Sequence, residues 1–177
     1  MRFRLGALAA LGVFGLSILA TVAVAAEPAL WLRYPAMSPD GQTIVFSYRG
    51  DIYRVPATGG VATPLTVHGA HDTRPVWSPD SSKIAFSSDR YGNFDVFVID
   101  AGGGVATRLT MHSAGDLPTS FTPDGGAVLF SSSRLDAASC VQFPSGAQPE
   151  LYEVSLDGGM PHQVLTTPAR YSVWDDA

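Results

Sequence analysis

The chain has 177 residues, a formal charge of −5 and a single cysteine, Cys140. One cysteine excludes an intrachain disulfide, so the hydrophobic core has to hold the fold together. Only 15% of the residues are charged and the basic ones form no cluster, which excludes nucleic acid as an expected partner.

Residues 1–26 have the features of a secretory signal peptide. Arg2 and Arg4 precede an uncharged run that starts at Leu5, and this run ends in small residues at Ala25 and Ala26. We expect cleavage after one of these two alanines and a periplasmic or secreted location for the remaining chain. The uncharged run is also long enough to cross a bilayer, so an uncleaved N-terminal membrane anchor is the alternative.

A short turn recurs three times after this leader. Its copies are Ser38-Pro39-Asp40-Gly41, Ser78-Pro79-Asp80-Ser81 and Thr122-Pro123-Asp124-Gly125, which are 40 and then 44 residues apart. Repeats of about 40–45 residues that hold four short strands each are typical of β-propeller blades. The sequence therefore predicts an all-β fold: an incomplete β-propeller of about three four-stranded antiparallel blades plus the start of a fourth.

The recurring turns also predict the blade boundaries within 27–177. Blade 1 is expected at about 31–66, blade 2 at about 74–110, blade 3 at about 117–166, and the start of blade 4 at about 170–177. Propellers close with about four to eight blades, so we expect this chain to be a truncated part of a longer propeller.

Each copy has the same internal pattern of strands. An apolar residue and a Phe follow the turn aspartate at alternate positions, as Ile44 and Phe46 do in the first copy, which indicates a half-buried strand. A double glycine ends the next strand, and a fourth strand is expected at Leu65-Thr66, Leu109-Thr110 and Leu165-Thr166. Aromatic residues near the first strands are expected to pack in the core: Trp31, Trp77, Phe121 and Trp174.

The two ends of a blade differ in their sequences. In a four-stranded meander, the first and third turns share one end, and the second turn and the link to the next blade share the other. The recurring turns lie at the first end, whereas the connections at the second end, which we call the variable end, change from copy to copy. Variable loops on a fixed scaffold are common binding sites. We therefore predict contacts with a peptide or protein partner at Arg49, His68, Arg90, Tyr91, His112, Arg134 and Phe143.

The third copy carries a much longer connection at this end, 134–148, which contains Cys140 and Phe143. It is too long for a hairpin turn. Two interpretations stay open: a contact loop that covers a neighbour or ligand, or a loop packed on the adjacent blade.

The sequence predicts no catalytic residue, no cofactor site and no metal site. His68, His71 and Asp72 resemble a ligand set, but a histidine and an aspartate recur 44 residues later at His112 and Asp116, as a repeated structural bond would require. A Gly-x-Ser-x-Gly nucleophile motif does not occur in the chain. Cys140 has no histidine close in sequence, and we interpret it as incidental.

Several stretches together resemble a known family. They are 35–41, the second-copy loop Ser87-Ser88-Asp89-Arg90-Tyr91-Gly92-Asn93-Phe94-Asp95, and the third-copy stretch Gln142-Phe143-Pro144-Ser145-Gly146 before Pro149-Glu150-Leu151-Tyr152. With the secretory leader, they resemble the N-terminal propeller of bacterial tricorn-like serine peptidases over essentially the whole chain after the leader. The Ser-Pro-Asp-Gly turn is also shared with TolB-like propellers and with prolyl-oligopeptidase-type enzymes.

This resemblance implies a large serine peptidase in which propellers precede a PDZ-like module and a catalytic domain. The propellers would guide or filter peptides, and the full-length protein would form a homo-oligomer. None of the family's catalytic residues has a counterpart in this chain. The alternatives are a TolB-like periplasmic propeller that binds proteins without enzymatic activity, and a prolyl-oligopeptidase-type chain that continues into an α/β-hydrolase domain.

Overall fold

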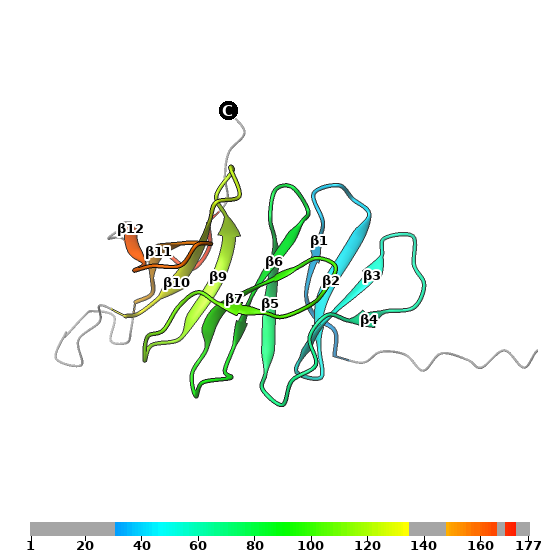
Figure 1. The fold of residues 1–177 in the computed structure, drawn as a ribbon, viewed down its shortest axis with the longest axis horizontal. Coiled ribbons are helices and arrows are strands. Elements are labelled where there is room, and N and C mark those ends of the chain that lie inside the picture. The colour runs from blue at the N-terminus through cyan, green and yellow to red at the C-terminus, as the bar shows by residue number, and fades with distance from the viewer. Residues whose placement is uncertain (1–30, 135–147, 166–168, 173–177) are drawn as a thin grey trace, which may run out of the picture.

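The structure is a computed structural model that describes residues 31–134, 148–165 and 169–172. The described residues form twelve strands in three four-stranded sheets, and each strand pairs with its neighbours in antiparallel fashion. Figure 1 shows the three sheets side by side in chain order. The predicted fold class is confirmed: the chain is all-β and propeller-like, and its sheets form an open array.

Within each sheet the strands follow chain order from one edge to the other. The first sheet, blade 1, contains β1 (Arg33–Met37), β2 (Thr43–Tyr48), β3 (Asp51–Pro56) and β4 (Thr63–Pro64). Blade 2 contains β5 (Asp72–Trp77), β6 (Lys83–Ser88), β7 (Asp95–Asp100) and β8 (Thr107–Arg108). Blade 3 contains β9 (Asp116–Phe121), β10 (Ala127–Ser132), β11 (Glu150–Ser155) and β12 (His162–Leu165). The first strands β1, β5 and β9 lie next to one another, so the blades converge along these strands.

The fourth strands of blades 1 and 2 lie two residues earlier than the sequence pattern suggested. Strand β4 ends at Pro64, and Leu65 and Thr66 follow it as buried residues. Leu65 packs into the core, and the Thr66 hydroxyl accepts a hydrogen bond from the backbone N–H of Ile52 at 2.9 Å. The Ile52 carbonyl oxygen still accepts the backbone N–H of Leu65, at 2.7 Å. The threonine hydroxyl replaces only the backbone carbonyl that would accept the N–H of Ile52, so the regular strand pairing ends at Pro64. Blade 2 repeats this bond between Thr110 and Val96.

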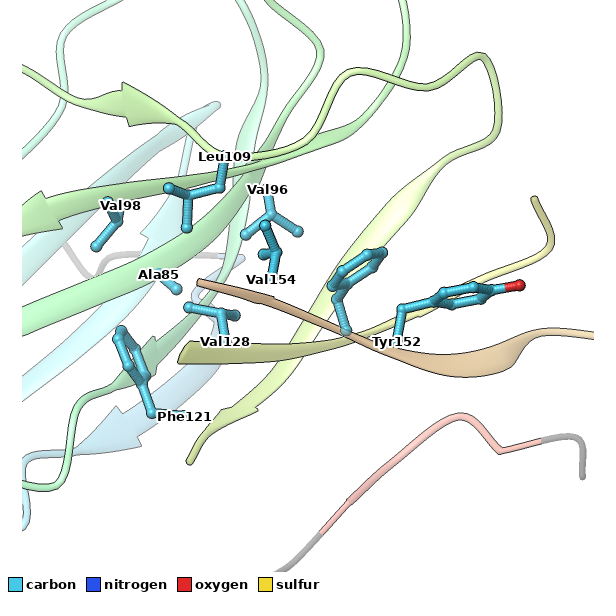
Figure 2. Close-up of a cluster of buried hydrophobic side chains, with 9 residues drawn as sticks. Ala85, Val96, Val98, Leu109, Phe121, Val128, Tyr152 and Val154 are labelled. Carbon is cyan, nitrogen blue, oxygen red and sulfur yellow. The ribbon is translucent and has the colours of Figure 1, made fainter. Parts of the chain in front are cut away.

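Two hydrophobic clusters fill the spaces between neighbouring blades. The cluster between blades 1 and 2 consists of Val45, Ile52, Leu65, Ile84, Phe86, Phe97 and Ile99. The cluster between blades 2 and 3 consists of Ala85, Val96, Val98, Leu109, Phe121, Val128, Phe130, Tyr152 and Val154. Figure 2 shows side chains of blade 2 facing side chains of blade 3 in this second cluster. Burial of these faces against each other is the main stabilising force of the array.

The aromatic residues near the first strands do not all pack as expected. Phe121 is buried, and Trp77 packs beside the first cluster while its indole N–H donates to the carbonyl oxygen of Ala36. The prediction is wrong for Trp31, which precedes β1 and is 74% exposed. Trp174 lies outside the described residues.

Polar bonds between blades differ from one interface to the next. Between blades 1 and 2, the Arg54 guanidinium donates to the carbonyl oxygen of Ala101 at 2.6 Å, in addition to the bond from Trp77. Between blades 2 and 3, the Ser87 hydroxyl donates to the carbonyl oxygen of Asp116 at 2.7 Å. Each interface thus has its own set of hydrogen bonds.

The recurring turns close one end of every blade with the same bonds. The hydroxyl of Ser38, Ser78 or Thr122 donates to the aspartate two residues later and accepts the backbone N–H five residues later. These hydroxyl bonds, together with backbone N–H donors, lower the pKa values of Asp40 and Asp124, and they lower that of Asp80 to about 2. Hydrogen bonds within each turn therefore pair the hydroxyl, carboxylate and backbone N–H groups at this end of the blade.

Candidate functional site

The variable end is built by contacts between the connections that the sequence placed there. The backbone N–H of Asp72 donates to the carbonyl oxygen of Gly50, and that of Asp116 donates to the carbonyl oxygen of Phe94. Each link between blades is thereby tied to the loop between the second and third strands of the preceding blade. The predicted contact residues that the structure describes all lie on these loops, on these links or directly beside them.

Arg90 and Arg134 are held in equivalent ion pairs. The Arg90 guanidinium lies 2.7 Å from the Asp72 carboxylate, and Arg134 makes the same pair with Asp116. Both aspartates are fully buried, and the arginine side chains are 16% and 11% exposed. Each arginine also lies over the aromatic rings of its own blade, as Arg90 does over Phe86 and Phe97. These two arginines therefore lock the first strand of their blade to its second loop.

Tyr91 stands beside this lock and is the most exposed aromatic side chain of the second-blade loop, at 65%. Its ring is parallel to that of Phe97, with centroids 6.3 Å apart, and the Arg108 guanidinium lies 4.3 Å from its centroid. Arg108 also pairs with the buried Asp95 at 2.7 Å. Burial raises the pKa of Asp95, and the Arg108 charge partly opposes this rise. The Tyr91 ring is thus exposed to solvent and is held in position by Phe97 and Arg108.

His68 and His112 have equivalent structural bonds. The Nδ1 atom of His68 accepts the backbone N–H of Ala70, and that of His112 accepts the backbone N–H of Ala114. The backbone N–H of His68 donates to Asp51. The recurrence of these histidines is explained by the shape of the interblade link. Within the described ranges, no group of three or more histidine, cysteine or acidic side chains is arranged to hold a metal ion.

Arg49 belongs to a hollow between blades 1 and 2, which we call the blade 1 hollow. Its volume is about 330 Å³, and its lining includes Trp31, Arg33, Ser47, Tyr48, Arg49 and His71. The Arg49 guanidinium lies 5.2 Å from the centroid of the Tyr48 ring, and that of Arg33 lies 5.9 Å from the centroid of a Trp31 ring. This hollow combines cationic and aromatic groups at the variable end.

Phe143 lies outside the described residues, as does most of the long third-blade connection. Both interpretations of that connection therefore stay predictions. Cys140 lies in the same segment.

One feature of the variable end was not found from the sequence. Blades 2 and 3 share three residues: an aspartate that starts the first strand, a serine that ends the second strand, and an arginine two residues after the serine. They are Asp72, Ser88 and Arg90 in blade 2, and the same residue types recur 44 residues later in blade 3. Blade 1 has Leu32 and Gly50 at the aspartate and arginine positions. The ion pair could have been predicted from this triplet, because the three residues recur at the same spacing in blades 2 and 3 while the loops around them differ in sequence.

A family model for the tricorn protease N-terminal beta propeller domain matches residues 29–176. The chain belongs to this family. The predicted resemblance is thereby confirmed, and the three described blades are those of a tricorn-type N-terminal propeller.

Solved structures agree with this assignment at the level of the fold. A putative TolB from Agrobacterium tumefaciens is 26% identical, with a TM-score of 0.61 over 76% of this chain and 48% of its own. The structure of the tricorn protease is 21% identical, with a TM-score of 0.67 over 82% of this chain and 14% of its own. TolB from Acinetobacter baumannii is 22% identical, with a TM-score of 0.59 over 77% of this chain and 33% of its own. The chain thus spans less than half of each structure.

None of the described segments of this tricorn-type propeller forms a helix that is long and apolar enough to cross a membrane. The predicted signal peptide at 1–26 lies outside the described residues.

Proposed function

We propose that this chain is the noncatalytic N-terminal propeller segment of an exported tricorn-like serine peptidase, where it guides or filters peptide substrates and supports assembly. The family match over 29–176 carries the proposal. Its partners would be peptides or unfolded polypeptide, the remaining blades and peptidase domain of the parent protein, and further copies of the parent in a homo-oligomer. The leader pattern at 1–26 supports a periplasmic or secreted location.

The mechanism would depend on shape, because no catalytic residue is predicted in this chain. Blades around a central channel admit an extended polypeptide and exclude a folded one. The variable end supports this role, since its loops carry exposed aromatic and cationic side chains such as Tyr91 and Arg49, whereas the opposite end carries short turns closed by local bonds. Extended polypeptide would first contact the variable end.

Photo-crosslinking in the intact parent protein tests this proposal. A benzophenone amino acid replaces Tyr91 at the variable end, and a matched variant carries it in place of Val61, which is 83% exposed in the loop before β4 at the opposite end. We expect position 91 to capture a reduced and carboxymethylated, unfolded protein far more than the native form of that protein. Equal capture at both positions, or capture of the folded form alone, would contradict the guiding role.

Two further measurements on the intact parent test the enzymatic and assembly parts. A serine-directed fluorophosphonate reagent should label the parent outside this chain, and light scattering should give the mass of a homo-oligomer. The alternative is a TolB-like binding propeller without enzymatic activity, which the 26% identity to the Agrobacterium structure favours. Absence of labelling, together with stable binding to an envelope protein, would support that alternative.

A further inference from the structure

Six arginines of the described residues fall into two groups according to their partners. Arg90, Arg108 and Arg134 each pair with a buried aspartate. In the part of the chain that the structure describes, Arg33, Arg49 and Arg74 have no carboxylate within ion-pair distance, although they lie over aromatic rings as the paired arginines do. Arg74 lies 4.7 Å from the Tyr34 ring and joins the first strands of blades 1 and 2. Two of these three cations, Arg33 and Arg49, line the blade 1 hollow in a chain of net charge −5.

These residues also have an unusual backbone conformation. Positive φ angles occur at Trp31, Tyr34, Arg49 and Arg74, and the one further non-glycine residue of this kind in the described chain is Ser81. Tyr34 and Arg74 occupy equivalent irregular positions of β1 and β5, at which the strand register shifts. Such bulges re-aim side chains, and backbone strain of this kind collects at binding sites. The strained positions therefore cluster where the arginines lack acidic partners.

The blade 1 hollow provides space and a further polar group at the same place. It is lined by Arg33 and Arg49 and by Ser47, which is 6% exposed. Among the described residues, the Ser47 hydroxyl has no hydrogen-bond partner, whereas the equivalent Ser87 hydroxyl donates to the backbone of the next blade. A buried hydroxyl without a partner is costly, and a ligand atom in the hollow would satisfy it. The hollow thus combines a free hydroxyl with two cations and a flat aromatic wall.

We propose that the blade 1 hollow binds carboxylate side chains of an acidic segment in an extended polypeptide, an inference that rests on the proposed function in peptide guidance. Guanidinium groups bind carboxylates through paired N–H donors. The rings of Trp31 and Tyr48 hold these groups in place and limit the entropy that is lost on binding. Two arginines on separate segments suit several successive carboxylates. This site would give the propeller a preference for acidic stretches among the polypeptides that it contacts.

Fluorescence anisotropy with the intact parent protein tests the inference. The probes are a labelled peptide with a run of glutamates and an amidated C-terminus, the same peptide with glutamines, and the glutamine peptide with a free C-terminal carboxylate. Arg49→Gln removes one charge from the hollow, and the matched control Arg170→Gln removes one charge from an exposed site elsewhere. Melting of both variants checks that they fold, and Arg33→Gln replaces Arg49→Gln if the latter does not.

We expect the glutamate peptide to bind the unaltered protein about tenfold more tightly than the amidated glutamine peptide, as one charge-assisted bond would give. Arg49→Gln should weaken glutamate-peptide binding about tenfold, and Arg170→Gln should change it by less than about twofold. Equal binding of glutamate and glutamine peptides, or equal loss in both variants, would overturn the inference. Tight binding of the free-carboxylate glutamine peptide would also overturn it, because the terminus would then be the ligand.

The crosslinking experiment separates this inference from the proposed function. Capture of a neutral unfolded polypeptide at position 91, without any preference for glutamate peptides, would reject the acidic-segment inference alone. Failure to capture any polypeptide at the variable end would reject the guiding role itself.

Discussion

Asp40, Asp80 and Asp124 are exposed in the turns at one end of the blades, whereas Asp72 and Asp116 are fully buried at the other end. The exposed aspartates accept bonds from a hydroxyl and a backbone N–H within a few residues. The buried ones depend on an arginine 18 residues further along the chain. One end is therefore stabilised locally, and the other by contacts that form only once the sheet has folded.

The largest difference between the two ends should come from removing a buried aspartate. Asp72→Ala leaves the Arg90 guanidinium, whose side chain is 16% exposed, without its partner, which should lower local stability by about 3–5 kcal/mol. Hydrogen exchange of peptides covering 72–90 in the intact parent measures this loss. The control Asp100→Ala removes an exposed pair with Lys83 and should cost less than about 1 kcal/mol. Similar losses in both variants would contradict the distinction.

A smaller effect is expected at the turn end. Ser78→Ala removes a hydroxyl that donates to Asp80 and accepts the backbone N–H of Lys83 at 2.8 Å. The expected loss of local stability is about 1–2 kcal/mol, confined to blade 2, because neighbouring turns have their own bonds. Hydrogen exchange of 76–86 measures it, with the exposed Ser113→Ala as control. A loss that spreads to blades 1 and 3 would show that the turns are coupled.

A still smaller effect tests backbone strain in the same turn. Gly41 and Gly125 have φ angles of 71° and 73°, and Ser81 occupies the equivalent position with a φ angle of 60°. Ser81→Gly should relieve this left-handed conformation and stabilise the turn by less than about 1 kcal/mol, because the change also removes the hydroxyl that accepts the backbone N–H of Asp40 at 3.2 Å. The mirror variant Gly125→Ser should destabilise blade 3 by a similar amount through the same backbone strain. Its Cβ would lie 3.7 Å from Pro79, an ordinary contact, so no clash adds to this strain. Thermal melts of both variants would refute the argument if their shifts had the same sign.

The stability contributions of Asp80 and Asp95 should respond to pH with opposite signs. The pKa of Asp80 is about 2 in the folded chain, below its ordinary value of 3.8, so its stabilisation is present above pH 3.8 and is lost as the pH falls through about 2. The pKa of Asp95 is raised by burial, so its contribution is greatest below pH 3.8 and is lost as the pH rises through the raised pKa.

The measurement compares the stabilities of Asp80→Asn and Asp95→Asn with that of the unaltered protein across the acidic range. We expect the advantage of the unaltered protein over Asp80→Asn to grow with pH and that over Asp95→Asn to shrink. Two slopes of the same sign would contradict the opposite environments of these carboxylates.

The same contrast explains what could be predicted from the sequence. The turn at Ser78 and Asp80 consists of adjacent residues, so its spacing predicted the blades and led to the correct family. The blade 1 hollow could not be predicted, because it depends on side chains of β1, β2 and the following link meeting in space. Arg90 and Arg134 were proposed as partner contacts, and their position at the variable end gave no sign that their side chains are mostly enclosed.

The hydrogen bonds between blades have a consequence for folding fidelity. Residues 59–66 and 103–110 are nearly identical in sequence, and chains with such similar neighbours are prone to pair the wrong units while they fold. Arg54 and Trp77 bond across the first interface, whereas Ser87 bonds across the second. The positions equivalent to Arg54 and Trp77 in the following blades are Val98 and Phe121, which cannot donate these bonds, so a wrong pairing of blades would lose one or both of them. The different hydrogen bonds at the two interfaces therefore favour the native order of the repeated blades.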